Sequence, residues 1–304
     1  MGKAALQLRV SQPTVSEAVA DLEHTFGVRL FDRSSRGVEP TTYGAALLKR
    51  SIVLFDELNQ SNRDIEFLTD PTTCELKIGC SESISATLLP QVIQEFSKRY
   101  PRVILQVDDV PSLALALPVL QDRKYDLALA RLAPPPRHDH PPDDLNVETL
   151  FDDQLIVAAG IHTRWARRRK IDLAELVDEP WILMAPNTWN YAGLAEAFQA
   201  RGLAMPKTNL LTFSVQLRAH LLANGPYITT FPRSVFRSNA DHFLLKLLPV
   251  DLPIRPWPVV VVTLRNRSLS PVVERFIECA REVARLFAGG AEGYTALQPK
   301  HKGS

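Results

Sequence analysis

Glycine and cysteine are both scarce in this sequence of 304 residues, and motifs that depend on them are absent. The 13 glycines are mostly isolated, so no glycine loop that would cradle a phosphate is present. The nucleophile motif G-x-S-x-G and the zinc motif H-E-x-x-H are also lacking. These absences disfavour an enzyme, and we expect a protein that uses no cofactor.

The three cysteines argue against a disulfide framework and against a zinc site. Cys74, Cys80 and Cys279 are odd in number and form no C-x-x-C pair, so we expect buried thiols in a reducing cytosol. The first residues, MGKAALQLRVSQP, lack the apolar core of a secretory signal, and no stretch approaches the roughly 20 apolar residues of a membrane span. We therefore expect a cytoplasmic protein with no membrane partner.

An excess of one charge sign is absent too, because the formal net charge is only +1. Any contact with nucleic-acid phosphates must then come from a local patch. The run Arg164–Lys170 resembles such a patch, but it precedes a predicted helix start at Asp172, and we expect a solvated surface turn. His138, Asp139 and His140 resemble metal ligands, but their Pro-rich loop offers no rigid support, so we expect no metal site.

A long helical run is predicted from Thr42 to Leu68. Its apolar positions recur at spacings of three and four, with Leu47, Leu54, Leu58 and Ile65 on one stripe. Such a stripe usually packs on its own domain. Because little chain precedes this helix, we favour a seam between two helices of a dimer.

From Glu75 onward, short β-branched runs alternate with amphipathic helices, which predicts an α/β sheet with crossover connections. The predicted strands are Leu76–Cys80, Val103–Val107, Tyr125–Ala130, Leu155–Ala159, Trp181–Met184, Tyr227–Phe231 and Val259–Leu264. The predicted helices are Ala86–Tyr100, Leu113–Arg123, Ala192–Arg201, Val215–Ala223 and one opened by Ser270-Pro271. Two similar α/β halves side by side are implied.

The segment VSQPTVSEAVADLEHTFGVRLFDRSSRGVEPTTYG resembles the recognition helix and wing of LysR-type transcriptional regulators. The pattern AAxxLxVSQPxVSxxxxxLExxxGxxLFxR can be read without gaps from Ala4 to Arg33. The segments IGCSESISATLLP, YDLALA, ANGPYITTFP and LSPVVERFIE follow in the order and approximate spacing of that family. The resemblance covers the chain to about Phe287.

The resemblance implies a multidomain regulator that binds double-stranded promoter DNA as a homodimer or homotetramer. An all-α part would hold a winged helix-turn-helix domain (1–41) and a dimerisation linker helix (42–70). An α/β effector domain (75–304) of two Rossmann-like subdomains, similar to type 2 periplasmic binding proteins, would bind a small-molecule effector. The expected subdomains are 75–133 plus 235–270, and 134–234.

In a helix-turn-helix, the first residues of the second helix meet base edges in the major groove. Ser11 suits the N-cap, and Pro13 suits the first helical position, where its missing N–H costs nothing. Gln12 can pair with adenine, and Thr14 can offer its methyl group to thymine. The expected DNA-contacting residues of this helix are Ser11, Gln12, Pro13, Thr14, Ser16 and Glu17.

The wing is expected to be a short basic loop that contacts phosphates or the minor groove. Its expected contact residues are Arg29, Arg33, Ser34 and Arg36. Residues 1–50 hold seven basic and five acidic residues, so the domain is only weakly basic. Glu17 stands where many relatives carry a basic or neutral residue, and it would lower the affinity or accept from a cytosine amine, depending on its exposure.

The resemblance starts inside the second helix of the family's DNA-binding domain, so we expect the first helix of that domain to be absent. That helix normally covers the apolar side of the other two. We therefore expect part of a core to be open to water and DNA binding to be poor. The apolar side chains concerned are Leu6, Leu8, Val10, Val15, Val19, Leu22 and Phe26.

Ligands of α/β sheets bind at the carboxyl ends of strands, where helix N-termini meet anions. Ser81 and Ser83 follow the first strand, and the resemblance maps the family's first ligand loop onto them, although both could simply cap a helix. Arg131 follows the YDLALA strand and could pair with an acidic effector. The second half would contribute Pro186, Asn187, Ser214, Thr229 and Thr230.

Two alternatives stay open. One is a truncated regulator that dimerises without binding DNA. The other is a solute-binding protein of the same fold, which the lack of an export signal and the presence of residues 1–68 disfavour.

Overall fold

The computed structural model describes residues 2–34, 37–70, 74–110, 120, 122–132, 144–186, 188–237 and 244–288. The chain divides into two compact units, 1–62 and 63–304. The boundary between them falls inside the helix α3, Thr42–Thr69, which is continuous in the structure. The sequence prediction for this helix, Thr42 to Leu68, is confirmed to within one residue.

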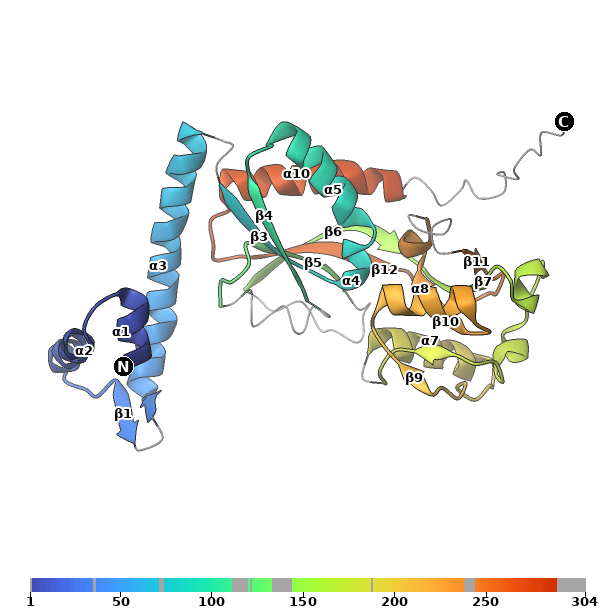
Figure 1. The fold of residues 1–304 in the computed structure, drawn as a ribbon, viewed down its shortest axis with the longest axis horizontal. Helices are drawn as coiled ribbons and strands as arrows, with labels where there is room; N and C mark the ends of the chain where they lie inside the picture. The colour runs from blue at the N-terminus through green and yellow to red at the C-terminus, as the bar shows by residue number, and fades with distance from the viewer. Residues whose placement is uncertain are drawn as a thin grey trace. The chain divides into compact units, whose positions relative to one another are not determined.

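The first unit consists of short helices and a hairpin ahead of α3 (Figure 1). Its elements are α1 (Gly2–Leu8), α2 (Gln12–Phe26), β1 (Phe31–Ser34) and β2 (Gly37–Pro40). Gly27 ends α2 in the left-handed conformation, with φ of 67°, which glycine adopts without steric cost. The strands β1 and β2 pair antiparallel as a hairpin.

The second unit begins with the last turns of α3. Phe67 is buried in the apolar core of this unit, 6.4 Å from the ring of Tyr100. Arg63 pairs with Asp126 at 3.3 Å, and Asp126 also pairs with Arg267 at 2.9 Å. The end of the linker helix is therefore fixed to the folded domain that follows it.

The first lobe of the second unit is built on a five-stranded sheet of order β4-β3-β5-β12-β6. The strands β3, β4 and β5 run parallel, and β12 runs antiparallel between β5 and β6. Helices α5 and α10 lie together on one face of this sheet (Figure 1). The elements of this lobe are β3 (Glu75–Cys80), α4 (Glu82–Ser85), α5 (Leu88–Arg99), β4 (Ile104–Asp109), β5 (Leu127–Arg131), β6 (Leu145–Asp153), β12 (Trp257–Leu264) and α10 (Pro271–Ala288).

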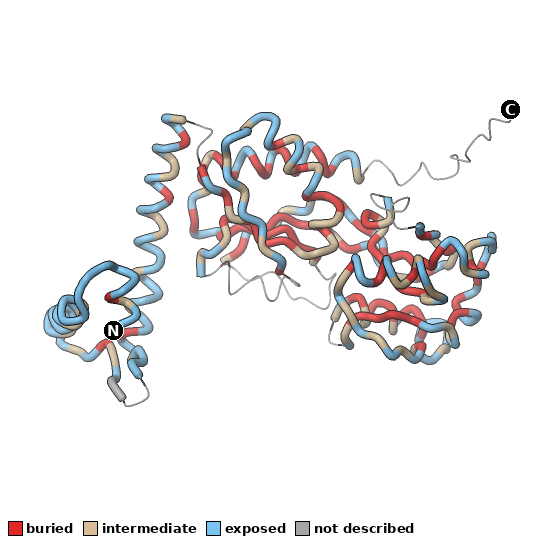
Figure 2. Tube along the Cα trace, in the orientation of Figure 1, coloured by how far each residue is buried: buried red, intermediate tan, exposed pale blue. Residues whose placement is uncertain are grey.

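The core of the first lobe lies between the sheet and these two helices. Phe96 of α5 meets Phe276 of α10 edge to face, with ring centroids 5.3 Å apart, and both side chains are fully buried. All five residues of β5 are buried, as expected for a strand covered on both faces. Figure 2 shows most strands of the second unit as buried, whereas β4 and most of α3 are exposed.

The second lobe has a three-stranded sheet of order β10-β7-β11 and a parallel pair, β8 with β9. Trp181, next to β8, bridges to Ile228 of β10 and joins the two sheets. The elements of this lobe are β7 (Leu155–Gly160), a 3-10 turn (Arg164–Arg167), a second 3-10 turn (Leu173–Leu176), β8 (Ile182–Leu183), α7 (Trp189–Ala200), β9 (Leu210–Leu211), α8 (Val215–Asn224), β10 (Ile228–Pro232) and β11 (Leu245–Leu247).

The expected subdomain ranges, 75–133 plus 235–270 and 134–234, are wrong at two places. Strand β6 was not predicted, and it pairs with β12 in the first lobe rather than belonging to the second. Strand β11 pairs with β7, so it belongs to the second lobe. The chain crosses between lobes directly after Asp153, and it returns between β11 and β12.

Other predicted elements differ in detail. The predicted helix Ala86–Tyr100 is α5, which is shorter and spans Leu88–Arg99. The short helix α4, Glu82–Ser85, was not predicted and precedes α5. The run Arg164–Lys170 begins as a 3-10 turn in which Arg164 pairs with Glu179. Most of the predicted helix Leu113–Arg123 and the whole loop with His138 and His140 lie outside the described residues.

In the part of the chain that the structure describes, no helix combines the length and the apolar character needed to cross a bilayer. Those same residues contain no cluster of three or more metal-ligating side chains.

Candidate DNA-binding surface and effector cleft

The N-terminus of α2 is formed by a capped and exposed first turn. Ser11 has extended backbone angles, and its Oγ accepts a hydrogen bond from the N–H of Thr14 at 3.3 Å, as an N-cap should. Helix α2 begins at Gln12, so Pro13 occupies the second helical position and not the first as predicted. Proline costs no hydrogen bond at the second position either, because the first four N–H groups of a helix have no partner within the helix.

The predicted DNA-contacting residues of α2 lie at its N-cap and in its first two turns. Ser11, Gln12, Pro13, Thr14 and Glu17 are exposed, and Ser16 is half-buried. The structure therefore brings these residues together at a helix start from which they can reach a partner. Because Glu17 is exposed, the accessible start of α2 also carries a carboxylate.

The hairpin is tied to α2 by a carboxylate that the sequence prediction did not include. Oε1 of Glu23, on α2, accepts hydrogen bonds from the backbone N–H groups of Leu30, at 2.7 Å, and Phe31, at 3.1 Å. Leu30 is buried, and Arg29 is exposed at the base of the hairpin. Of the other predicted wing residues, Arg33 and Ser34 lie in β1 with side chains outside the description, and Arg36 lies outside the described residues.

The start of α3 packs closely against the hairpin. Oγ1 of Thr41 donates to the carbonyl of Arg29 at 2.7 Å and accepts from the N–H of Gly44 at 3.1 Å. A Cβ atom on Gly44 would lie 1.9 Å from the carbonyl oxygen of Leu30, so only glycine fits there. The wing is therefore held from both sides, by α2 and by α3.

The apolar side chains of α1 and α2 are largely open to water, as the sequence predicted. Leu6 is 83% exposed and Phe26 is 53% exposed, and α2 has no buried residue. Leu8, Val10 and Leu22 are exposed as well, and Val15 and Val19 are half-buried.

In the second unit, Arg131 lies where the chain crosses between the lobes. Its guanidinium pairs with the carboxylate of Asp153 at 2.6 Å and donates to the hydroxyl groups of Ser83 and Ser234. Asp153 in turn accepts from the backbone N–H of Ser234 at 3.1 Å. Arg131 and Asp153 are both almost fully buried. Arg131 is therefore not the free cation that the sequence suggested, because Asp153 already compensates its charge.

The other predicted effector residues are in different states. Ser81 precedes α4, and its Oγ is buried without a hydrogen-bond partner among the described residues. Thr229 donates its hydroxyl to the carbonyl of Ile182 at 2.7 Å, so this side chain serves the sheet contact between β10 and β8. Thr230 is buried, Pro186 is exposed, and Asn187 lies outside the described residues.

Ser214 takes part in a contact that joins the two lobes, and its partner was missed by the sequence prediction. Oε1 of Glu82, on α4 of the first lobe, accepts from Oγ of Ser214 at 3.1 Å and from the N–H of Val215 at 2.8 Å. Ser214 is the N-cap of α8 in the second lobe, and its Oγ accepts from the N–H of Leu217. A carboxylate of one lobe thus occupies the helix N-terminus of the other.

Arg218, one turn further along α8, is also unexpected, because it is 1% exposed. Its guanidinium donates to three backbone carbonyls, of Phe213, Ser214 and Thr230, and lies 4.6 Å from the ring centre of Phe231. Burial lowers the pKa of Arg218 to about 10, and the nearby charge of Glu82 opposes this shift. No sign of this role is visible in the sequence, because an arginine within a predicted helix is usually exposed at the surface.

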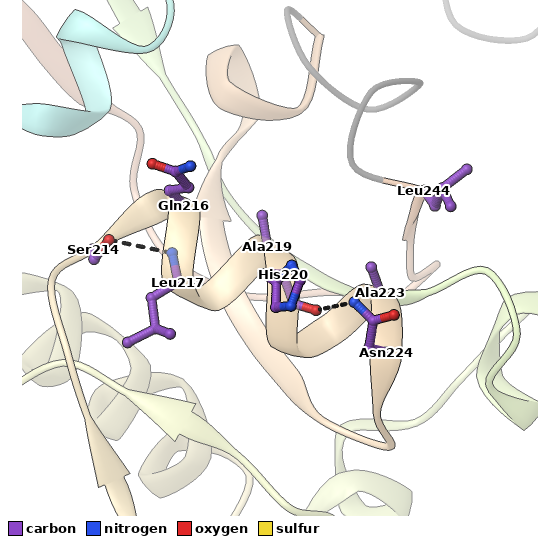
Figure 3. Close-up of a pocket in the computed structure, with 8 residues that line it drawn as sticks. All are labelled: Ser214, Gln216, Leu217, Ala219, His220, Ala223, Asn224 and Leu244. Carbon is purple, nitrogen blue, oxygen red and sulfur yellow. Dashed lines mark hydrogen bonds between the residues drawn. The ribbon is translucent and has the colours of Figure 1, made fainter.

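A groove runs along α8 from Ser214 (Figure 3). It has a volume of about 580 Å³, and it extends past Gln216 and His220 to Leu244. Its size is in the range of small-ligand sites. Ser214 is the predicted effector residue that lines it.

Two family profiles match the chain. The profile described as "LysR substrate binding domain" matches residues 70–285, which is more than half of the chain. The profile described as "Bacterial regulatory helix-turn-helix protein, lysR family" matches residues 1–45. The first match covers the two lobes of the second unit, and the second match covers α1, α2, the hairpin and the start of α3.

Curated relatives are similar over nearly the whole chain. The HTH-type transcriptional regulator TdcA of Escherichia coli (strain K12) is 26% identical over 285 residues, which cover 93% of this chain and 88% of that protein. The transcriptional dual regulator GltC of Bacillus subtilis (strain 168) is 25% identical over 273 residues, which cover 87% of this chain and 85% of the relative.

Solved structures share the fold. A full-length OxyR variant from Pseudomonas aeruginosa has a TM-score of 0.65 at 21% identity and covers 94% of this chain and 89% of that one. The effector binding domain of QuiR in complex with shikimate has a TM-score of 0.56 at 19% identity and covers 70% of this chain and 97% of that one.

Proposed function

The chain belongs to the LysR family of transcriptional regulators, and from this premise we propose that it reads promoter DNA through α2 and the β1–β2 hairpin. We propose further that a small-molecule effector binds between the two lobes of the second unit and controls this activity. Such a protein acts in the cytoplasm, without catalysing a reaction.

One observation carries the DNA-binding proposal: the first turn of α2 presents exposed polar side chains at a capped helix start. Gln12 offers an amide that can bond both edge atoms of adenine, and Thr14 offers a methyl group and a hydroxyl. The hairpin that follows is fixed against α2 by Glu23, so helix and wing would approach DNA as one surface.

The effector proposal rests on polar groups at the carboxyl ends of strands in both lobes. Ser81 and Ser83 follow β3, and Ser214 caps α8 across from them. The proposed contacts also keep Arg131, Pro186, Asn187, Thr229 and Thr230 from the sequence prediction, with Arg131 and Thr229 as supports of the site rather than free groups. A structure of similar fold binds shikimate, which supports a small-molecule ligand here.

The oligomer proposal rests on the exposed stripe of α3. Leu54 is 71% exposed and Leu58 is 60% exposed, and Ile65 continues the same stripe. Leu47 is half-buried. Apolar side chains at these spacings pair well with a second copy of the helix, so we propose a homodimer, from which a homotetramer could be built.

The DNA proposal can be tested with a pool of random duplexes. The full chain should enrich a specific sequence, but with an affinity lowered by the exposed apolar side chains of α1 and α2, and fluorescence anisotropy measures this affinity for the enriched duplex. Thr14→Ala should weaken binding about tenfold, the usual scale for one base contact. Thr25→Ala is the matched control, because Thr25 is also an exposed threonine and lies at the far end of the same helix.

Two results would contradict the DNA proposal. One is a pool that shows no enriched sequence after repeated selection by the full chain. The other is equal binding by Thr14→Ala and Thr25→Ala to the enriched duplex.

A further inference from the structure

The N-terminus of α8 already holds a carboxylate, and that carboxylate comes from the protein itself. Glu82 reaches from α4 of the first lobe to Ser214 and Val215 of the second, with distances of 3.1 and 2.8 Å. Helix N-termini bind anions through free N–H groups and the helix dipole. Charge-assisted hydrogen bonds of this length are among the stronger ones in proteins.

Arg218 gives this position a second reason to attract an anion. Its side chain is buried, and all of its hydrogen bonds within the described chain go to backbone carbonyls, so no carboxylate touches it there. A buried charge normally needs a counter-ion nearby. Arg218 lies one turn behind the place where the Glu82 carboxylate is bound, and it acts on Glu82 through space.

On its own lobe, Glu82 lies near a second carboxylate, that of Asp109. Asp109, at the end of β4, accepts a hydrogen bond from the backbone of Glu82, and the pKa of Asp109 is raised, chiefly by burial and then by the charge of Glu82. The two carboxylates therefore repel each other. Next to Glu82, Oγ of Ser81 is buried without a hydrogen-bond partner among the described residues. The hydroxyl group of Ser81 could therefore form a hydrogen bond with a ligand beside this contact.

We propose that the N-terminus of α8, backed by Arg218, is a carboxylate-binding subsite of the effector cleft, and that Glu82 occupies it in the effector-free protein. An acidic effector enters by displacing Glu82 from Ser214 and Val215. The inference rests on the proposed function, because it concerns the same cleft. It adds the position that the carboxylate of an acidic effector would take, and a residue of the protein that competes with it for that position.

The displacement explains how a small ligand can change the relation between the lobes. With Glu82 bound, the lobes are joined through the side chain of the first lobe. With an effector carboxylate bound, α4 is released from α8. The tethered Glu82 carboxylate competes at an effective concentration on the order of millimolar. It therefore excludes carboxylates that bind weakly, and it sets the concentration above which an effector can bind.

The subsite can be tested by removing Glu82 and supplying its carboxylate from solution. Propionate has the chemistry of the Glu82 side chain, and propionamide is its neutral counterpart. In the full-length Glu82→Ala variant we expect the Tm to fall by about 2–6 °C, as for the loss of a helix cap. Propionate should raise the Tm of this variant back toward the wild-type value, and propionamide should not.

Binding can be located with the backbone amide of Val215, observed by two-dimensional NMR of the labelled chain. Propionate should shift this amide in Glu82→Ala with at least tenfold higher affinity than in the wild type, where Glu82 competes. Glu82→Gln keeps the shape of the side chain and removes only its charge, so it should lie between the two. Glu95→Ala is the matched control, because Glu95 is an exposed glutamate of the same lobe whose contact is with Lys98.

The proposal is overturned if propionate affects Glu82→Gln, Glu82→Ala and the wild type equally, or if propionamide restores stability as well as propionate does. These readouts use no DNA, so they separate the two proposals. A variant that binds propionate while no duplex is ever enriched would refute DNA reading and leave the subsite standing. The reverse result would refute the subsite alone.

Discussion

Buried arginines of the second unit are compensated in two different ways. Arg131 pairs with Asp153 and Arg267 pairs with Asp126, each as a buried ion pair with further hydrogen bonds. Arg218 is bonded only to carbonyl oxygens within the described chain, and its pKa is lowered by burial. The first two are therefore structural ion pairs, whereas Arg218 has no carboxylate within hydrogen-bond distance among the described residues, and the proposed subsite depends on this difference.

The Arg131–Asp153 pair yields a prediction about stability. Asp153→Ala should lower the free energy of unfolding by about 3–5 kcal/mol, because it leaves the buried guanidinium of Arg131 without its counter-ion. The double variant Arg131→Met with Asp153→Leu should lose much less, because it buries no charge. Urea denaturation followed by tryptophan fluorescence measures both. Equal losses in the single and double variants would contradict the assignment.

The three cysteines yield a second prediction. Cys74, Cys80 and Cys279 are buried, and burial raises the pKa of each thiol, that of Cys80 to about 12. At pH 8 the thiolate fraction of Cys80 is then on the order of one in 10,000. The folded chain should not react with a disulfide reagent such as DTNB, whereas the chain unfolded in guanidinium chloride should release three equivalents of product. Rapid reaction of one thiol in the folded state would contradict this prediction.

At the level of single residues, sequence patterns predicted the groups that act locally. The cap at Ser11 and the turn chemistry beside it are read from neighbours in the chain. Glu82 and Arg218 were not predicted, because their roles depend on partners 132 residues away or on complete burial of a charged side chain. Arg131 was predicted at the correct strand end, but its pairing with Asp153 depends on a strand that the pattern did not show.

Among the elements, the junction between the hairpin and α3 depends on one glycine. Gly44→Ala should destabilise the first unit by about 2 kcal/mol or more, because the new Cβ would collide with the carbonyl of Leu30. Gly193→Ala is the control: it lies in α7, its new Cβ would meet Ile254 at 3.5 Å, and alanine favours a helix by up to about 1 kcal/mol. Circular dichroism during urea denaturation should show the loss for Gly44→Ala only. A similar loss for both variants would contradict the prediction.

The long helix α3 was predicted and the strand β6 was not, because their sequence patterns differ in regularity. The stripe of α3 repeats over 28 residues and leaves little ambiguity. Strand β6 mixes buried and exposed positions irregularly, and its pairing with β12 shifts register between Val259 and Val260, so no clean alternation marks it. Because β6 was not recognised, the prediction assigned the residues after the Pro-rich loop to the second lobe, whereas β6 belongs to the first.

For the molecule as a whole, the division into two units predicts unfolding in two steps. The first unit should unfold at lower denaturant concentration, because Leu6, Leu22 and Phe26 remain exposed and α2 buries no residue. All 4 tryptophans lie in the second unit, so their fluorescence reports only that unit. Circular dichroism should therefore begin to change before the fluorescence does, and a specific duplex should move the first step alone. Coincident transitions without DNA would contradict this prediction.

Continuity of α3 across the boundary between the units has a mechanical consequence. The helix is 28 residues long, which corresponds to about 42 Å, and its last turns are fixed to the first lobe by Phe67 and Arg63. A rigid rod of that length multiplies small rotations: a tilt of about 5° at the fixed end displaces the other end by about 4 Å. Successive base pairs of DNA are about 3.4 Å apart. A tilt of this size at one end of a rigid helix as long as α3 therefore corresponds, at its other end, to about one base-pair step.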